Sequence, residues 1–157
     1  MGYHKILLAL DINDAGTALF DEALDLAQKM GAELTLFCCF EQDTVAEAED
    51  RVMTFAEMNM SESERVHEKV RRVELEHVRA WLQSLAKLAV ERGVVARVDA
   101  EEGKPAQRIC EAAADWGADL IVLGHHSRHP LKELLLGSLN SHVVRNAPCS
   151  VLLVKQQ

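Results

Sequence analysis

The 157-residue sequence predicts a single-domain α/β protein in which helices cover both faces of an open parallel sheet. Three observations support this prediction. Five strand-like runs alternate with segments of helical periodicity, and strands that are joined through helices pair in parallel. The length fits one typical domain of roughly 100–150 residues. Hydrophobic residues make up 48% and charged residues 27%, which is ordinary for a globular protein and excludes a disordered one.

The N-terminal half predicts two strands and two helices. A buried strand is expected over Tyr3–Leu10, a helix over Ala15–Lys29 and a second strand over Glu33–Phe40, from runs of apolar residues or their three- and four-residue spacing. A long helix is expected over Glu62–Arg92, with its charges on a solvated face rather than beside a coiled-coil seam. The segment around 41–65 holds eight acidic and two basic residues, and we expect a mobile acidic insertion there.

The C-terminal half predicts three further strands. Alternating residues indicate a strand over Val94–Ala100, and a glycine followed by a proline opens a helix over Gly103–Trp116. The run Asp119–Leu123, apolar throughout after its first residue, is typical of a central strand. A helix over Leu131–Arg145 and a last strand over Ser150–Val154 complete the alternation.

Composition excludes several classes of function. The net charge of −8 argues against a nucleic-acid partner. The apolar runs are far shorter than the ~20 residues of a membrane span. No signal-peptide pattern follows Met1, so a cytoplasmic protein is expected. The four cysteines form no C-x-x-C pair, and we expect buried free thiols rather than a metal site.

Charge is distributed unevenly along the chain. From residue 124 to 157 there is one acidic residue against four basic ones, and four of the seven histidines lie there. A cationic segment in an acidic protein favours a small anionic ligand over a polymer. In open parallel sheets a ligand lies beyond the carboxyl ends of the strands, where the strand order reverses. The relevant loops are therefore those after Leu10, Phe40 and Leu123.

The segment from Gly124 to Asn140 has the pattern of an anion site: a strand, a glycine, a polar turn and a helix. Gly137 and Ser138 are expected to interrupt that helix, where glycine costs about 1 kcal/mol relative to alanine. Either the close approach of a ligand or backbone, or a packing requirement, would compensate. The pattern matches neither the Walker P-loop nor the dinucleotide fingerprint.

The chain resembles the universal stress protein family along almost its whole length. The resemblance is carried by YHKILLALD at the start, VDAEEGKPAQRICEAAADWGADLIVLG in the second half and LLLGSLNSHVVRNAPCSVLLVK at the end. It implies a five-stranded parallel sheet of order 3-2-1-4-5 and a homodimer. One branch of the family binds ATP through G-x-x-G, nine residues and G-[S/T], whereas another branch lacks these glycines and does not.

The resemblance implies an ATP site, with Mg²⁺ carried by the triphosphate. In it Asp11 would meet the ribose or the adenine edge, Cys39 would face adenine, and Gly124 and Gly137 would open and close the phosphate cradle. The implied site residues are Ala9, Asp11, Cys39, Gly124, His125, His126, Ser127, Arg128, His129, Gly137, Ser138, Leu139 and Asn140.

One departure from the family pattern concerns Ser127, which stands at the second glycine of G-x-x-G. If that position needs a positive φ, serine costs roughly 1–2 kcal/mol, or about tenfold in affinity. A serine hydroxyl can instead donate to a phosphate oxygen, and Arg128 adds charge. We therefore expect ATP binding to be retained.

Three functions stay open at this point. The favoured one is an ATP-binding, dimeric stress-response switch that associates through its C-terminal strand, Cys149–Val154. The second is a nucleotide-independent interaction protein, like the glycine-poor branch. The third is a slow ATPase, which has little support because the cradle offers only Glu133, with Asp11 and Asp14 approaching from the first loop. No catalytic residue is assigned.

Overall fold

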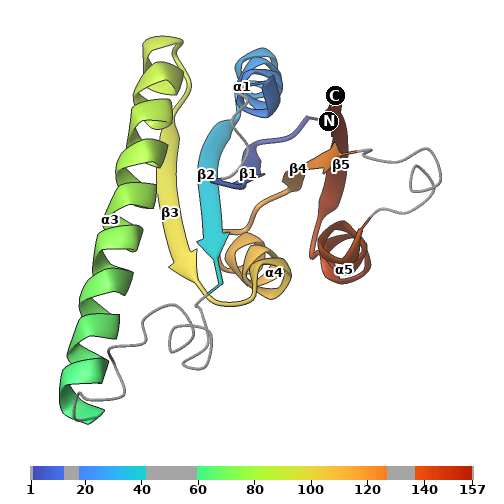
Figure 1. Ribbon diagram of the computed structural model, residues 1–157. Helices are drawn as coiled ribbons and strands as arrows, with labels where there is room; N and C mark the ends of the chain where they lie inside the picture. The colour runs from blue at the N-terminus through green and yellow to red at the C-terminus, as the bar shows by residue number, and fades with distance from the viewer. Residues whose placement is uncertain (1, 13–17, 42–59, 127–136, 157) are drawn as a thin grey trace.

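The computed structural model describes residues 2–12, 18–41, 60–126 and 137–156. In chain order the elements are β1 (Lys5–Leu10), α1 (Ala18–Met30), β2 (Glu33–Phe40), α3 (Met60–Glu91), β3 (Ala96–Glu102), α4 (Pro105–Trp116), β4 (Leu120–His126), α5 (Ser138–Asn146) and β5 (Ser150–Gln156) (Figure 1).

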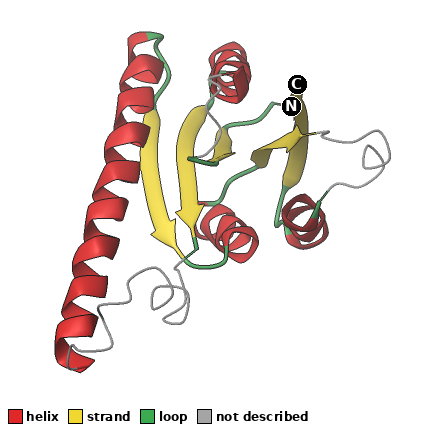
Figure 2. Cartoon of the chain, in the orientation of Figure 1, coloured by secondary structure: helices red, strands yellow, loops and turns green. Residues whose placement is uncertain are grey.

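The five strands form one parallel sheet in the order β3-β2-β1-β4-β5, which confirms the predicted topology (Figure 2). The chain runs outward from β1 through β2 to β3, and then crosses back to add β4 and β5 on the other side of β1. The strand order thus reverses between β1 and β4. This is the position at which open α/β sheets place their ligands.

The two central strands separate at this switch point. β1 pairs with β2 along its full length, from Lys5–Glu33 to Leu10–Cys38. In the described chain, β1 pairs with β4 at three positions, the last of them Leu8–Val122, although both strands continue further. The carboxyl ends of β1 and β4 therefore part from each other, and the sheet opens where a ligand would lie.

At the opposite end of β1 and β4, one carboxylate joins the two strands by hydrogen bonds. The side chain of Asp119 accepts hydrogen bonds from the backbone N–H groups of His4 and Lys5, at 2.8 Å and 3.0 Å. The backbone N–H of Asp119 donates to the carbonyl of Lys5 at 2.9 Å. Asp119 thereby sets the register of β4 against β1 before the two strands separate.

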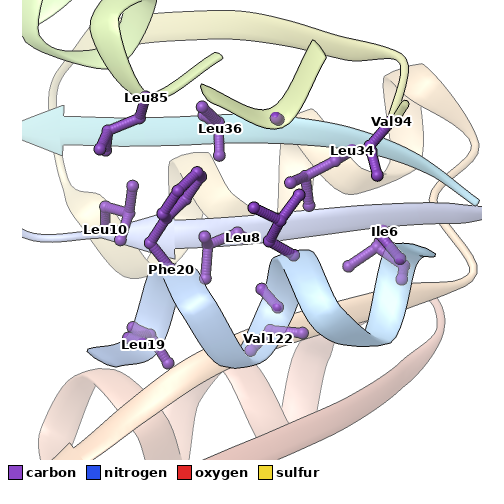
Figure 3. Close-up of a cluster of buried hydrophobic side chains, with 14 of the residues drawn as sticks. Ile6, Leu8, Leu10, Leu19, Phe20, Leu34, Leu36, Leu85, Val94 and Val122 are labelled. Carbon is purple, nitrogen blue, oxygen red and sulfur yellow. The ribbon is translucent and has the colours of Figure 1, made fainter. Parts of the chain in front are cut away.

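Helices cover both faces of the sheet, as predicted. Buried residues of α1 and α3 pack with Ile6, Leu8 and Leu36 on one face to form the α1–α3 cluster, part of which is drawn in Figure 3. On the other face, buried residues of α4 and α5 pack with the β-strands to form a second cluster. This α4–α5 cluster consists of Leu7, Phe37, Ile109, Ala112, Ala113, Ala118, Ile121, Leu123 and Val143.

Two predicted boundaries near the candidate site are wrong. β4 does not stop at Leu123 but continues to His126, because Gly124, His125 and His126 pair with Val154, Lys155 and Gln156 of β5. The predicted helix over Leu131–Arg145 does not run through Gly137. That residue has φ +83° and ψ 160°, which no helix residue adopts, and α5 begins after it.

The expectation of a mobile acidic insertion stays a prediction. Most of the acidic segment around 41–65 lies outside the described residues, and α3 already begins at Met60. Within the described chain, no helix combines the length and the apolar character needed to cross a membrane.

Candidate functional site

A side-chain hydrogen bond joins the two ends of the predicted cradle. The amide Nδ2 of Asn140 donates to the carbonyl oxygen of Gly124 at 3.1 Å, and Asn140 is only 8% exposed. Asn140 lies in the first turn of α5, and Gly124 lies near the end of β4. The bond therefore holds the N-terminus of α5 against the end of β4, and residues 127–136, between the two elements, lie outside the described chain.

Gly137 sets the start of α5. Its φ of +83° with ψ of 160° belongs to a region that is almost restricted to glycine. The carbonyl of Gly137 accepts the N–H of Ser141 at 3.0 Å, which begins the helical hydrogen bonds. The first backbone N–H groups of a helix have no partner within it, and together with the helix dipole they favour an anion. In α5 these groups belong to Ser138, Leu139 and Asn140.

Gly124 has a packing reason to be glycine. A Cβ at this position would lie 2.9 Å from Oε1 of Gln156 and 3.2 Å from Cδ2 of Leu19. Sequence reasoning missed both neighbours, which come from β5 and α1. The strand alternation contains part of the signal, because Gly124 follows Val122 on the α1 face and pairs with Val154, two residues before Gln156.

Three predicted site residues from distant parts of the chain share one face of the sheet. Ala9 of β1, Cys39 of β2 and Leu139 of α5 are half-buried and pack against the α4–α5 cluster. They provide an apolar surface beside the cradle. The thiol of Cys39 donates to the carbonyl of Gly103 at 3.6 Å, which links the end of β2 to the turn before α4.

Burial makes the adjacent thiols of Cys38 and Cys39 weaker acids than an ordinary cysteine. It raises the pKa of Cys38 to about 11, with a further increase from the charge of Asp11. Burial also raises the pKa of Cys39 to about 12, followed in importance by the negative charge of Glu101. Both side chains are therefore neutral thiols at physiological pH. Asp11 itself is exposed directly after β1, close enough to act on Cys38.

The remaining predicted residues divide into two groups. His125 and His126 are the last residues of β4 rather than members of a loop, and the side chain of His125 is half-buried. Ser127, Arg128 and His129 lie outside the described residues. Among the described residues, no group of three or more His, Cys, Asp or Glu side chains could hold a metal ion.

These features define a doubly wound α/β protein with the N-terminus of a helix, α5, at its switch point. The family model described as "Universal stress protein family" matches residues 2–155. The chain belongs to the universal stress protein family, as its motifs predict.

Relatives match along the full length of the chain. Universal stress protein Sll1388 of Synechocystis sp. is 34% identical over 155 residues, which cover 99% of each chain. Universal stress protein MJ0531 of Methanocaldococcus jannaschii is 30% identical over 156 residues, covering 98% of this chain and 83% of the relative.

Solved structures share the fold. Universal stress protein UspA from Lactobacillus plantarum superposes with a TM-score of 0.75 at 24% identity, covering 98% of this chain and 99% of the other. The protein MJ0577 gives a TM-score of 0.73 at 23% identity, covering 100% and 99%. A third universal stress protein was solved in complex with cAMP and gives a TM-score of 0.63 at 20% identity, covering 98% of each chain.

Proposed function

We propose that this protein binds an adenine nucleotide, ATP with Mg²⁺ in the first place, between the separated ends of β1 and β4 and acts as a dimeric stress-response switch. The phosphates would lie at the N-terminus of α5, and the base would lie against Ala9 and Cys39. Ligand binding can act as a switch only if the nucleotide has different affinities for two conformations. A family neighbour in complex with cAMP supports a nucleotide as the class of ligand.

The hydrogen bond from Asn140 to Gly124 carries this proposal. It adds a directional contact to the packing of Leu139 and Val143 in the α4–α5 cluster, and it fixes the start of α5 relative to the end of β4. With it, the backbone N–H groups of the first helical turn are held at the switch point before any ligand arrives. A preorganised site binds more tightly because less ordering remains to be done on binding.

The first test is direct. Freshly purified protein is denatured, and any released nucleotide is identified by chromatography; the stripped protein is then titrated with Mg-ATP and with cAMP. Adenine nucleotide near one per chain, or saturable binding, supports the proposal. Absence of both at millimolar ATP overturns it and favours a nucleotide-independent interaction protein.

A pair of asparagines in α5 provides matched variants. Asn140→Ala removes the bond to Gly124 and is expected to weaken ATP binding about tenfold, the value of a ~1.4 kcal/mol interaction. Asn146→Ala removes a bond of 2.9 Å to His142 at the far end of the same helix and should leave the affinity unchanged. Equal effects of both variants would contradict a role for the Asn140 bond. Gly124 is a poorer probe, because substitution would disturb Leu19 and Gln156.

The dimer is assigned to the edge strand β5. Leu152 of this strand is 40% exposed, and a groove of about 150 Å³ lies between α1 and the β4–β5 side of the sheet. An apolar edge strand is stabilised by pairing with another strand. Leu152→Glu is expected to lower the mass of the assembly in sedimentation. Val95, directly before β3 at the opposite edge of the sheet, is 66% exposed, and Val95→Glu should leave the mass unchanged. An unchanged mass for Leu152→Glu would remove β5 as the interface.

A further inference from the structure

The first turns of α3 extend beyond the sheet. Nη1 of Arg71 lies 3.9 Å from Oε2 of Glu102, the last residue of β3, and this ion pair marks the level at which the strand ends. The helix begins at Met60, so residues 60–70 continue past that level for about 16 Å at 1.5 Å per residue. Figure 1 shows this end of α3 projecting beyond the arrowhead of β3. An isolated helix as short as residues 60–70 is marginal in water without a packing partner.

An apolar stripe begins in the projecting part of α3 and continues past Arg71 to Val73. Val70 and Val73 are each 52% exposed, and Val66 is half-buried. At 3.6 residues per turn, these three valines lie within about 60° of one another around the helix. They are about 120° away from the face of α3 that enters the α1–α3 cluster. That buried face consists of Val78, Leu82, Leu85 and Ala89. We call Val66, Val70 and Val73 the α3 stripe.

Charges along a border of the α3 stripe complement a second copy of the same stripe. Lys69 and Glu76 lie on one border, seven residues apart, and both are exposed. In an antiparallel helix pair, the same border of each helix faces that of the other. With Val70 opposite Val73 of the partner subunit, Lys69 comes opposite Glu76 of the partner subunit, and the two-fold symmetry repeats this pair.

The direction of the pairing follows from the shape of the molecule. In a parallel pair, the two sheets would lie side by side along the same stretch of helix. In an antiparallel pair with Val70 opposite Val73, residues 60–70 of each helix lie along residues 73–83 of the other, and the two sheets extend in opposite directions from the centre of the pair. The antiparallel arrangement therefore keeps the two sheets at opposite ends of the pair and covers the projecting turns of each helix with the helix of the partner subunit.

We propose that the α3 stripe packs antiparallel against the α3 stripe of a second copy of this chain. This contact is independent of the nucleotide site and of β5, because β3 and β5 form opposite edges of the sheet. Two self-complementary contacts at opposite edges build assemblies larger than a dimer.

The test isolates the α3 contact by removing the β5 contact first. Sedimentation equilibrium at micromolar concentration is measured for Leu152→Glu alone and combined with Val70→Glu and Val73→Glu. We expect the first protein to be a dimer and the second a monomer. The matched control adds Val90→Glu instead, because Val90 is 58% exposed on a third face of the same helix. It should remain a dimer, and circular dichroism verifies that all variants keep their helix content. A monomeric Leu152→Glu protein overturns the proposal.

A charge exchange tests the antiparallel register and does not depend on the valines. In the Leu152→Glu protein, Lys69→Glu and Glu76→Lys should each raise the dimer dissociation constant about tenfold, because each turns two attractive pairs into repulsive ones. The double exchange should restore the original dissociation constant. If Glu76→Lys has no effect, or the double exchange is no better than the single changes, the antiparallel pairing is wrong.

Discussion

Thr35 places a hydroxyl group inside an apolar layer. Its side chain is 2% exposed on β2, between Leu7 of β1 and Arg97 of β3, and among the described residues its Oγ1 has no hydrogen-bond partner. A buried hydroxyl without a partner costs roughly 1–3 kcal/mol relative to solvent. Valine has nearly the same shape and no such group.

Thr35→Val should therefore stabilise the protein by about 1 kcal/mol in urea unfolding, whereas Thr35→Ala should destabilise it by leaving a small cavity. Far-UV circular dichroism of both variants against the parent chain checks the prediction. Loss of stability in the valine variant would mean that the hydroxyl finds a partner in solution.

The adjacent thiols provide a second prediction for single residues. With pKa values of about 11 and about 12, Cys38 and Cys39 hold little thiolate at pH 8. An ordinary cysteine of pKa ~8.5 holds at least a hundredfold more, and the thiolate is the reactive form. Iodoacetamide followed by peptide mass spectrometry should label both residues very slowly in the native protein and readily in urea. Rapid native labelling of Cys39 would contradict its burial against the carbonyl of Gly103.

At the level of the elements, Asp119 joins β4 to β1. Its carboxylate accepts two backbone N–H groups, and a hydrogen bond to a charged group contributes about 1.5–3 kcal/mol. Asp119→Ala is expected to lower the free energy of unfolding by about 2 kcal/mol. The exposed Asp115 of α4 offers a control, because its side chain makes no hydrogen bond within the described chain; Asp115→Ala should have little effect. Equal losses in the two variants would mean that the hydrogen bonds of Asp119 to His4 and Lys5 contribute nothing measurable.

The ionisation of Glu101, between β3 and α4, makes the stability of the fold depend on pH. Burial raises the pKa of Glu101, and the neighbouring Asp99 raises it further, while Arg108 opposes both. Because the folded-state pKa lies above the unfolded one, ionised Glu101 weakens the fold at neutral pH, and the fold gains stability as pH falls through the folded-state pKa.

Glu101→Gln should therefore raise Tm at pH 7.5, and the difference should disappear near pH 4, where Glu101 is protonated. Glu102→Gln is the control, because Glu102 faces Arg71 of α3 on the opposite side of the strand. A gain from Glu101→Gln that is the same at both pH values would show that charge is not its cause.

For the whole molecule, nucleotide binding should appear as stability. A ligand at a hundred times its dissociation constant stabilises the folded state by about 2.7 kcal/mol, which corresponds to roughly 5–10 °C in Tm for a domain of this size. Thermal unfolding with and without Mg-ATP measures this shift. The Asn146→Ala variant should keep it, and Asn140→Ala should reduce it at the same ATP concentration. An unshifted Tm at millimolar Mg-ATP would contradict the proposed site.

Local patterns were sufficient to predict the helices, the strands and the covering of both sheet faces, because helix and strand periodicity depends on residues that are close in the sequence. They failed at Gly124 and Gly137. The polar residues after Leu123 suggest a strand end, and only pairing with β5 extends β4 to His126. The leucines before Gly137 continue a helical spacing in the sequence, and no spacing reveals the φ of +83° at Gly137, directly before α5.

Some features of the candidate site could be predicted from local patterns, and others could not. Strand alternation places Ala9 and Cys39 on one face, as the α4–α5 cluster confirms. The neighbours of Gly124 depend on how α1 rotates over the sheet and on where β5 ends, and neither is a local property. The roles of the site residues toward a nucleotide stay predictions.

The central position of β1 has a consequence for synthesis on the ribosome. β1 is the first strand to be made, yet one of its two neighbours, β4, comes from residues 120–126, after more than a hundred further residues. Until then, β1, β2 and β3 can pair, but the far edge of β1 offers unpaired N–H and C=O groups to any other extended chain. The nascent protein is thus most prone to aggregate just before β4 emerges, and Asp119 is the residue that begins to close that edge.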